Sequence, residues 1–270
     1  MDQVSGPIHP EKRRNMKIRI TAVGLILAAL GLAVAGCRIS SQEITRIETR
    51  PTAPTIKMEP GEHPLGLGGL RLVNRDVIRR DGLLYIPRIS EEGKPMPLLV
   101  WLHGGGGNCE SYRYLFPIAE DFNIVVLALD ARHNTWDGID SPFGPDVEFI
   151  DAAVKHTFDR VHIDPTRIVL GGLSDGASYA LAIGRVNGDL FTHLVAVAPG
   201  LLEPPASVIG NPRILVAHGT RDNVYHVAGS RNFIVPGLKK AGYNVAYLEF
   251  DGPHWLPSPI AAQVFKWIME

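Results

Sequence analysis

The sequence contains few cysteines, and its charges nearly balance. It has 2 cysteines among 270 residues, and its formal net charge is −1. A chain with so little excess charge has no strong electrostatic attraction to nucleic acid, so we do not expect a nucleic-acid-binding protein. The remaining composition, 45% hydrophobic and 20% charged residues, is ordinary for a globular domain with a sizeable core.

The sequence also lacks the common motifs of metal and phosphate sites. Its 10 histidines include no His-Glu-x-x-His spacing, so no metal site is indicated. The glycine run at 104–107 lacks the Gly-Lys-Ser/Thr ending of a phosphate-binding loop, which gives that alternative little weight. No internal repeat is evident. We therefore expect neither a metal nor an organic cofactor.

The N-terminal segment is basic and then apolar. Residues 12–19 hold five basic side chains, and residues 20–36 are uncharged, as in a signal peptide. The run ends in Val34-Ala35-Gly36-Cys37, which resembles the lipobox of bacterial lipoproteins. We expect residues 1–36 to be removed and Cys37 to carry a lipid that anchors the protein to a membrane. An uncleaved anchor helix and simple secretion are the alternatives, and all three place the domain outside the cytoplasm.

Two further segments follow the expected signal. Residues 38–69 are polar, then rich in proline and glycine, and they lack periodic hydrophobicity, which predicts a flexible tether from 37 to 69. A single α/β domain is expected over residues 70–270. Cys109 is the one cysteine left inside it, so no intrachain disulfide is expected.

The domain alternates apolar runs with amphipathic segments. Asp81-Gly82 between two apolar runs predicts an N-terminal antiparallel hairpin. The later runs are nearly continuous in valine, leucine and isoleucine, as in parallel strands covered on both faces; they are Leu98–Leu102, Ile124–Leu129, Ile168–Gly171, Leu194–Ala198, Ile214–Ala217 and Val245–Phe250. Helices are expected at 111–121, 146–160, 176–187, 230–242 and 259–269. This alternation predicts a mostly parallel sheet of about eight strands with helices on both faces.

The stretch Gly171–Ser178 (GGLSDGAS) contains a serine in the pattern Gly-x-Ser-x-Gly. A strand precedes it and a helix follows it. Glycines at positions 172 and 176 permit the sharp turn that exposes a nucleophilic serine, and the helix N-terminus behind it favours negative charge. We therefore predict that Ser174 is a nucleophile.

A second glycine-rich stretch, His103–Asn108, directly follows the strand at 98–102. Nucleophilic attack on an ester creates an oxyanion, which backbone N–H groups must stabilise. Glycines let the backbone approach closely. We assign the oxyanion hole to the N–H groups of Gly105 and Asp175, with Gly106 as a second candidate in the loop.

Two more loops at the same sheet edge supply an acid and a base. Asp222 follows the strand at 214–217, and His254 follows the last strand. A histidine suits proton transfer near neutral pH, and a carboxylate can orient it. The rivals are less suitable: Asp251 lies three residues from His254, His218 precedes the acid, and His226 precedes the last strand. The predicted order is serine, aspartate, histidine.

The chain resembles serine esterases of the α/β-hydrolase superfamily, in the phospholipase/carboxylesterase or polyhydroxybutyrate-depolymerase-like branch. The motifs that carry the resemblance are LLVWLHGGGGN, DPTRIVLGGLSDGASYA, HGTRDNVYHV and GPHWLP. It implies the α/β-hydrolase fold, a triad of Ser174, Asp222 and His254, and an oxyanion N–H from Gly105. The stretch 131–137 is similar to an element of these carboxylesterases, which implies that Trp136 lines the substrate pocket. Two departures from the pattern are the four consecutive glycines and HVAGSR after the acid, where relatives usually have a proline.

The leading hypothesis is a serine hydrolase that cleaves carboxylic esters through an acyl-enzyme. The alternatives are a peptidase of the prolyl-oligopeptidase type and a non-catalytic envelope lipoprotein. Only residues 201–211 separate two late strands, so a minimal cap and an open site are expected. Such a site suits small esters or acyl groups on polymers, with Trp255, Trp136 and Phe143 as candidates for an apolar wall.

Overall fold

The computed structural model describes residues 46–73, 76–88, 93–139, 141–200, 205 and 207–270. The basic segment, the apolar run and Cys37 lie outside these residues, so lipid anchoring stays a prediction of the sequence. Part of the segment expected to form a minimal cap also lies outside them. Within the described ranges, no helix is long and apolar enough to cross a membrane.

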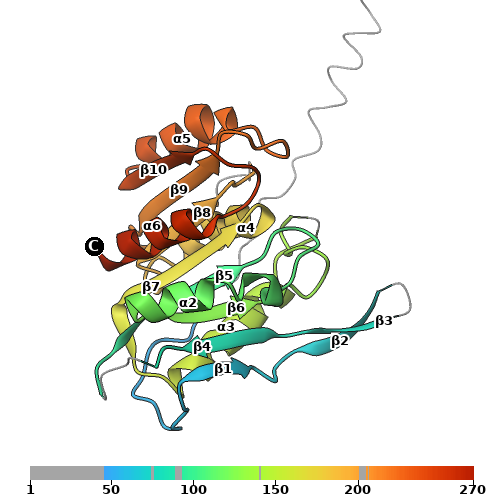
Figure 1. The fold of residues 1–270 in the computed structure, drawn as a ribbon, viewed down its shortest axis with the longest axis vertical. Coiled ribbons are helices and arrows are strands. Elements are labelled where there is room, and N and C mark those ends of the chain that lie inside the picture. Colours follow the sequence, from blue (N-terminus) through green and yellow to red (C-terminus); the bar gives the residue numbers. More distant parts are fainter. Residues whose placement is uncertain (1–45, 74–75, 89–92, 140, 201–204, 206) are drawn as a thin grey trace, which may run out of the picture. The chain divides into compact units, whose positions relative to one another are not determined.

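An eight-stranded sheet forms the centre of the fold, in the order β1-β4-β6-β5-β7-β8-β9-β10 (Figure 1). Its strands are β1 (Gly61–Pro64), β4 (Gly82–Ile86), β5 (Met96–Leu102), β6 (Val125–Leu129), β7 (Ile163–Leu173), β8 (His193–Val197), β9 (Arg213–Gly219) and β10 (Val245–Phe250). Along the sheet, β6, β5, β7, β8, β9 and β10 pair in parallel with their neighbours. At the other end, β4 pairs antiparallel with both β1 and β6. The predicted α/β fold with a mostly parallel sheet is therefore confirmed.

Helices cover both faces of the sheet because the central strands are apolar on both. Every residue of β5 is buried: Leu98, Val100 and Leu102 join one core, while Leu99 and Trp101 join the other. This alternation follows from the two-residue period of a strand. The helices are α2 (Leu115–Phe122), α3 (Pro145–Phe158), α4 (Asp175–Val186), α5 (Val235–Lys240) and α6 (Ser258–Met269), with a short 3₁₀ helix η2 (Cys109–Tyr112) and a π-helix η3 (Ser230–Ile234). Helices α3 and α4 pack in the first core, α2 and α6 in the second.

The antiparallel hairpin is present, but its turn was predicted in the wrong place. It joins β2 (Gly69–Val73) to β3 (Asp76–Arg80) in a separate two-stranded sheet. Asp81 and Gly82 do not form its turn, because β4 begins there and pairs with β1 and β6 instead. The Asp81 carboxylate accepts hydrogen bonds from three successive N–H groups, at residues 66, 67 and 68. Aspartate is common in turns because its carboxylate binds nearby backbone N–H groups. Asp81 does this here without forming the hairpin turn.

The predicted tether over 37–69 is wrong for its described part, from residue 46 onward. Ile47 is 0% exposed, and its N–H donates to the Asn187 side chain at 2.9 Å. Arg46 pairs with Asp189 at 2.7 Å, and β1 belongs to the main sheet. This segment has no periodic hydrophobicity because an extended chain is held by single contacts. The folded domain therefore includes residue 46 and does not begin at residue 70.

Stability of the fold should fall as pH drops from about 6.5 to about 4, because of His193 at the start of β8. This side chain is 7% exposed; burial first, then Arg213 and Arg167, lowers its pKa to about 4. The unfolded chain takes up a proton near pH 6.5 and the folded chain resists it, so acid favours unfolding. The effect amounts to about 3 kcal/mol at most.

Denaturant unfolding at pH 7 and pH 4 measures this loss. The variant His193→Gln should show a smaller loss of stability between the two pH values. The matched control is His162→Gln, since His162 is exposed. An equal loss in the wild-type and His193→Gln proteins would show that His193 does not cause the pH dependence.

Candidate active site

Ser174 lies at the sharp turn between β7 and α4. Its backbone has φ 56° and ψ −120°, a region that residues with side chains rarely adopt. A Cβ at Gly172 would lie 2.6 Å from the Leu102 oxygen, and one at Gly176 would lie 2.4 Å from the same atom. Both positions therefore require glycine. The turn directs the serine side chain to the carboxyl edge of the sheet, in front of the N-terminus of α4.

Asp222 and His254 are joined by a short hydrogen bond. The Nδ1 atom of His254 lies 2.6 Å from Oδ2 of Asp222, and these residues follow β9 and β10. Burial acts to raise the pKa of Asp222, but hydrogen bonds from His254 and from the N–H groups of Val224 and Tyr225 outweigh it and lower that pKa below its usual value. Asp222 is therefore a carboxylate at neutral pH. It can hold the Nδ1–H of His254 and leave Nε2 free to accept a proton.

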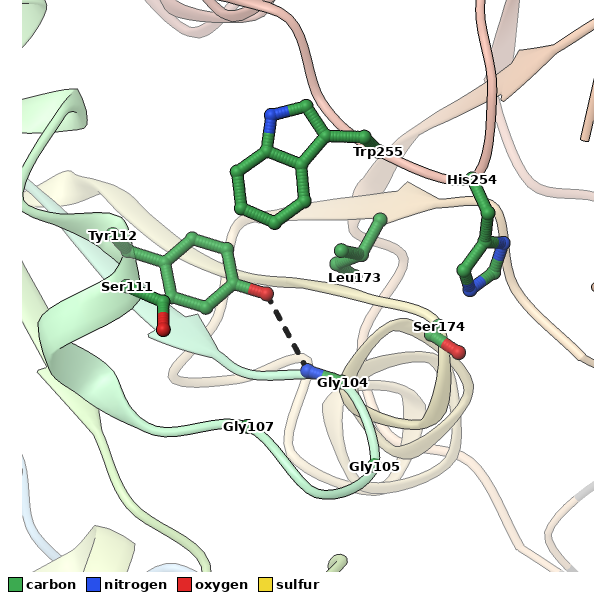
Figure 2. Close-up of a pocket in the computed structure, with 9 residues that line it drawn as sticks. All are labelled: Gly104, Gly105, Gly107, Ser111, Tyr112, Leu173, Ser174, His254 and Trp255. Carbon is green, nitrogen blue, oxygen red and sulfur yellow. Dashed lines mark hydrogen bonds between the residues drawn. The ribbon is translucent and has the colours of Figure 1, made fainter.

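The imidazole of His254 is directed toward Ser174, and both residues line one pocket (Figure 2). The described structure gives no hydrogen bond between these two side chains. Such contacts are often long in enzymes without substrate and tighten when it binds. The structure thus brings the three residues predicted from the sequence to one edge of the sheet.

A second histidine, His218, contacts the same carboxylate. Its Nε2 lies 3.1 Å from Oδ2 of Asp222 and 2.8 Å from the Tyr225 carbonyl oxygen. Because both of these oxygens only accept, Nε2 carries a ring proton, and Nδ1 of the neutral ring accepts from the Ser230 hydroxyl at 2.7 Å. The sequence indicated His218 only as a less suitable base and did not predict this contact. The rival acid Asp251 pairs with Arg221 at 2.8 Å, whereas Asp222 is the carboxylate that His254 contacts.

Three of the four glycine N–H groups in the loop after β5 already have acceptors. Gly106 donates to the Asn134 carbonyl at 2.8 Å, and Gly107 donates to the Gly104 carbonyl at 2.9 Å. Gly104 donates to the hydroxyl of Tyr112 at 3.4 Å. The N–H of Gly106, our second candidate for the oxyanion hole, is therefore occupied.

The N–H groups of Gly105 and Asp175 remain without an acceptor among the described residues. The two residues are neighbours in space, since a Cβ at Gly105 would be 2.5 Å from Oδ2 of Asp175. The loop also touches the nucleophile, because a Cβ at Gly104 would be 3.2 Å from the Ser174 Cβ. Thr135 donates a hydrogen bond to Asp175 Oδ2 at 2.7 Å and so holds this carboxylate beside the loop. The arrangement offers two free N–H donors next to the serine.

Trp136 does not line the pocket, contrary to the prediction. It is 0% exposed, donates its indole N–H to the His103 carbonyl at 2.8 Å and stacks on Tyr179. Phe143 also stacks on Tyr179. Trp136 therefore supports the start of the glycine loop from the core, through its contact with His103. A sequence pattern identifies an aromatic residue near the site but does not say on which side of the backbone its ring lies.

The pocket beside Ser174, which we name the serine pocket, has a volume of about 180 Å³. It is lined by Gly104, Gly105, Gly107, Ser111, Tyr112, Leu173, Ser174, His254 and Trp255. Trp255, predicted to contact substrate, is 39% exposed and forms part of the wall. Its ring stacks on Tyr112, with centroids 5.9 Å apart. The pocket is thus aromatic on one side and has the nucleophile and the histidine on the other (Figure 2).

Comparison with known proteins gives relatives that carry esterase names. The chain is 28% identical over 142 residues to NocK of Nocardia uniformis subsp. tsuyamanensis, which is named as an esterase; the match covers 48% of this chain and 41% of that protein. It is 30% identical over 135 residues to "Probable feruloyl esterase C" of Aspergillus oryzae, covering 46% of this chain and 47% of that protein. The chain thus spans under half the length of these curated relatives.

A solved structure and a family model give the same fold. The S-formylglutathione hydrolase of Staphylococcus aureus superposes with a TM-score of 0.59 at 13% identity, covering 80% of this chain and 99% of that one. At this identity the likeness shows the fold alone. The sequence model of the Alpha/beta hydrolase family matches residues 99–266, which is more than half of the chain and includes Ser174, Asp222 and His254. The chain therefore belongs to the alpha/beta hydrolase family.

Proposed function

We propose that this protein hydrolyses carboxylic esters through an acyl-enzyme formed on Ser174. The observation that carries the proposal is the 2.6 Å contact between Asp222 and His254, beside a serine at a strained turn. The esterase names of its sequence relatives support the reaction class. A nucleophile, an oriented base and two free N–H donors are the groups that acyl transfer requires.

In this mechanism the Nε2 atom of His254 accepts the proton of the Ser174 hydroxyl as its oxygen attacks the ester carbonyl. Asp222 stabilises the resulting imidazolium. The N–H groups of Gly105 and Asp175 bind the oxyanion of the tetrahedral intermediate. As this collapses, the C–O bond to the alcohol breaks and His254 gives the alcohol its proton. Water, activated by the same histidine, then releases the acid.

The serine pocket suits a small group better than a long chain. Its volume is about 180 Å³, whereas pockets for drug-sized ligands are roughly 300–1,000 Å³. We propose short acyl esters, or acyl groups attached to a polymer that stays outside the pocket, as substrates. The name of the Aspergillus relative, a feruloyl esterase, is consistent with the polymer-linked case.

A fluorophosphonate probe tests the proposal directly, because it modifies only an activated serine. We expect one labelled site, identified as Ser174 by peptide mapping, together with hydrolysis of p-nitrophenyl butyrate. Dipeptide amides, which a peptidase of the prolyl-oligopeptidase type would cleave, should be poor substrates. Folded protein that neither reacts with the probe nor cleaves any ester would point to a non-catalytic binding protein.

A further inference from the structure

Tyr112 places a buried hydroxyl group in the serine pocket. It is the last residue of η2, it is 3% exposed, and it lines the pocket with Ser174 and His254. Its oxygen accepts a hydrogen bond from the Gly104 N–H at 3.4 Å, drawn as a dashed line in Figure 2. The mechanism above gives this hydroxyl no role.

The proton of this hydroxyl has no acceptor among the described residues. A phenol can donate one hydrogen bond as well as accept, and here only the acceptor function is used. Burial raises the pKa of Tyr112 to about 12, so the proton stays on the oxygen at neutral pH. A buried donor without a partner is unfavourable, and the pocket is where a partner can enter.

The hydroxyl is held in a fixed position by aromatic neighbours. The Tyr112 ring stacks on Trp255 at 5.9 Å between centroids and contacts Trp101 at 5.7 Å. Gly104 lies next to both the hydroxyl and the nucleophile. A Cβ added to Gly104 would lie 3.2 Å from the Ser174 Cβ, and the hydrogen bond to the Gly104 nitrogen is 3.4 Å long, so the hydroxyl oxygen lies within about 9 Å of the Ser174 Cβ. An ester bound at Ser174 can therefore reach it within a few bonds of its carbonyl carbon.

We propose that the Tyr112 hydroxyl donates a hydrogen bond to an oxygen atom of the substrate and selects esters that carry such an oxygen. The preferred class is short esters with an ether, carbonyl or hydroxyl oxygen a few bonds from the scissile carbonyl. The aromatic wall and Leu173 contact the apolar remainder of that group. This inference rests on the proposed ester hydrolysis and makes Tyr112 its specificity-determining residue.

The test compares the wild-type enzyme with Tyr112→Phe on pairs of esters that differ by one oxygen. For the acyl side, p-nitrophenyl 3-methoxypropanoate is paired with p-nitrophenyl pentanoate. For the alcohol side, 2-methoxyethyl acetate is paired with butyl acetate. In at least one pair, Tyr112→Phe should lower kcat/KM for the oxygen-bearing ester about 5-fold to 10-fold more than for its hydrocarbon partner, as expected for one lost hydrogen bond. Which pair responds identifies the side of the ester that binds in the pocket.

The matched control is Tyr243→Phe, which also removes a tyrosine hydroxyl; this one has no hydrogen-bond partner in the described structure and belongs to the first core rather than the pocket. It should change both members of each pair equally. A second measurement uses the wild-type enzyme alone. The kcat/KM for each ester is divided by the rate constant for its alkaline hydrolysis, and this ratio should be higher for the oxygen-bearing ester of the responding pair. Equal losses in every pair, with probe labelling of Ser174 intact, would overturn the inference and leave the proposed function standing. A wild-type protein that the probe does not label at Ser174 would overturn both the inference and the proposed function.

Discussion

Replacing Ser174 with alanine should lower kcat/KM for p-nitrophenyl butyrate by on the order of 10³-fold or more. The reason is that the other serine hydroxyl in the pocket, that of Ser111, donates to Asn108 and makes no hydrogen bond to His254 in the described structure, so only the oxyanion donors and binding would remain. Steady-state kinetics measures the loss, and the fluorophosphonate probe should no longer label the protein.

Folding should survive this change, because the Ser174 hydroxyl makes no hydrogen bond within the described residues and alanine is no larger. An unchanged thermal midpoint therefore separates loss of chemistry from loss of structure. The control is Ser141→Ala, since Ser141 is exposed on another loop; its activity should match the wild type. Ester hydrolysis that persists at wild-type rate in Ser174→Ala would exclude the acyl-enzyme mechanism at this residue.

The Asp222→Asn variant should lose activity by about 10³-fold to 10⁴-fold. Oδ1 of Asp222 accepts the N–H groups of Val224 and Tyr225 at 2.8 and 2.9 Å, so the amide oxygen of asparagine would take that place. The amide NH₂ would then face the rings of His254 and His218. His254 would have to present an unprotonated Nδ1 to it and carry its proton on Nε2, which could no longer accept a proton from Ser174.

The kinetics of this variant should show a fall in kcat with little change in KM, because the tautomer affects the chemical step rather than the pocket. Asp251→Asn is the matched control, since it removes a carboxylate from the same part of the chain. Asp251 is exposed and pairs only with Arg221 among the described residues, so activity should stay within about 2-fold of the wild type. If Asp251→Asn were the more damaging change, the assignment of the acid would be wrong.

The positions of Ser174, Asp222 and His254 could be predicted because each follows an apolar run. Parallel strands end at one edge of a sheet, so three residues far apart in the sequence are expected together once the strands are recognised. The contact of His218 with Asp222 could not be predicted in this way. It depends on the fold of residues 223–230, which returns the Tyr225 carbonyl and the Ser230 hydroxyl to the histidine.

The errors at the N-terminal side have a common physical cause. Periodicity reports one face of a regular element, and residues 46–64 are held instead by individual contacts such as that of Ile47 with Asn187. Asp81-Gly82 was read as a hairpin turn because its residue types favour turns, but the Asp81 side chain serves three backbone N–H groups of the preceding segment. Trp136 shows the same limit, since burial depends on neighbours that a local pattern does not contain.

The contacts of Arg46 also fix where the described N-terminal segment lies relative to the nucleophile. Arg46 binds the Val186 carbonyl and Asp189 at the C-terminal end of α4, whereas Ser174 stands at the N-terminal end of the same helix. A helix of 12 residues is about 18 Å long, so the chain enters the domain on the side remote from the nucleophile. The described N-terminal segment is thus fixed at one end of α4 and the nucleophile at the other, so contacts made at residue 46 leave the catalytic edge of the domain open.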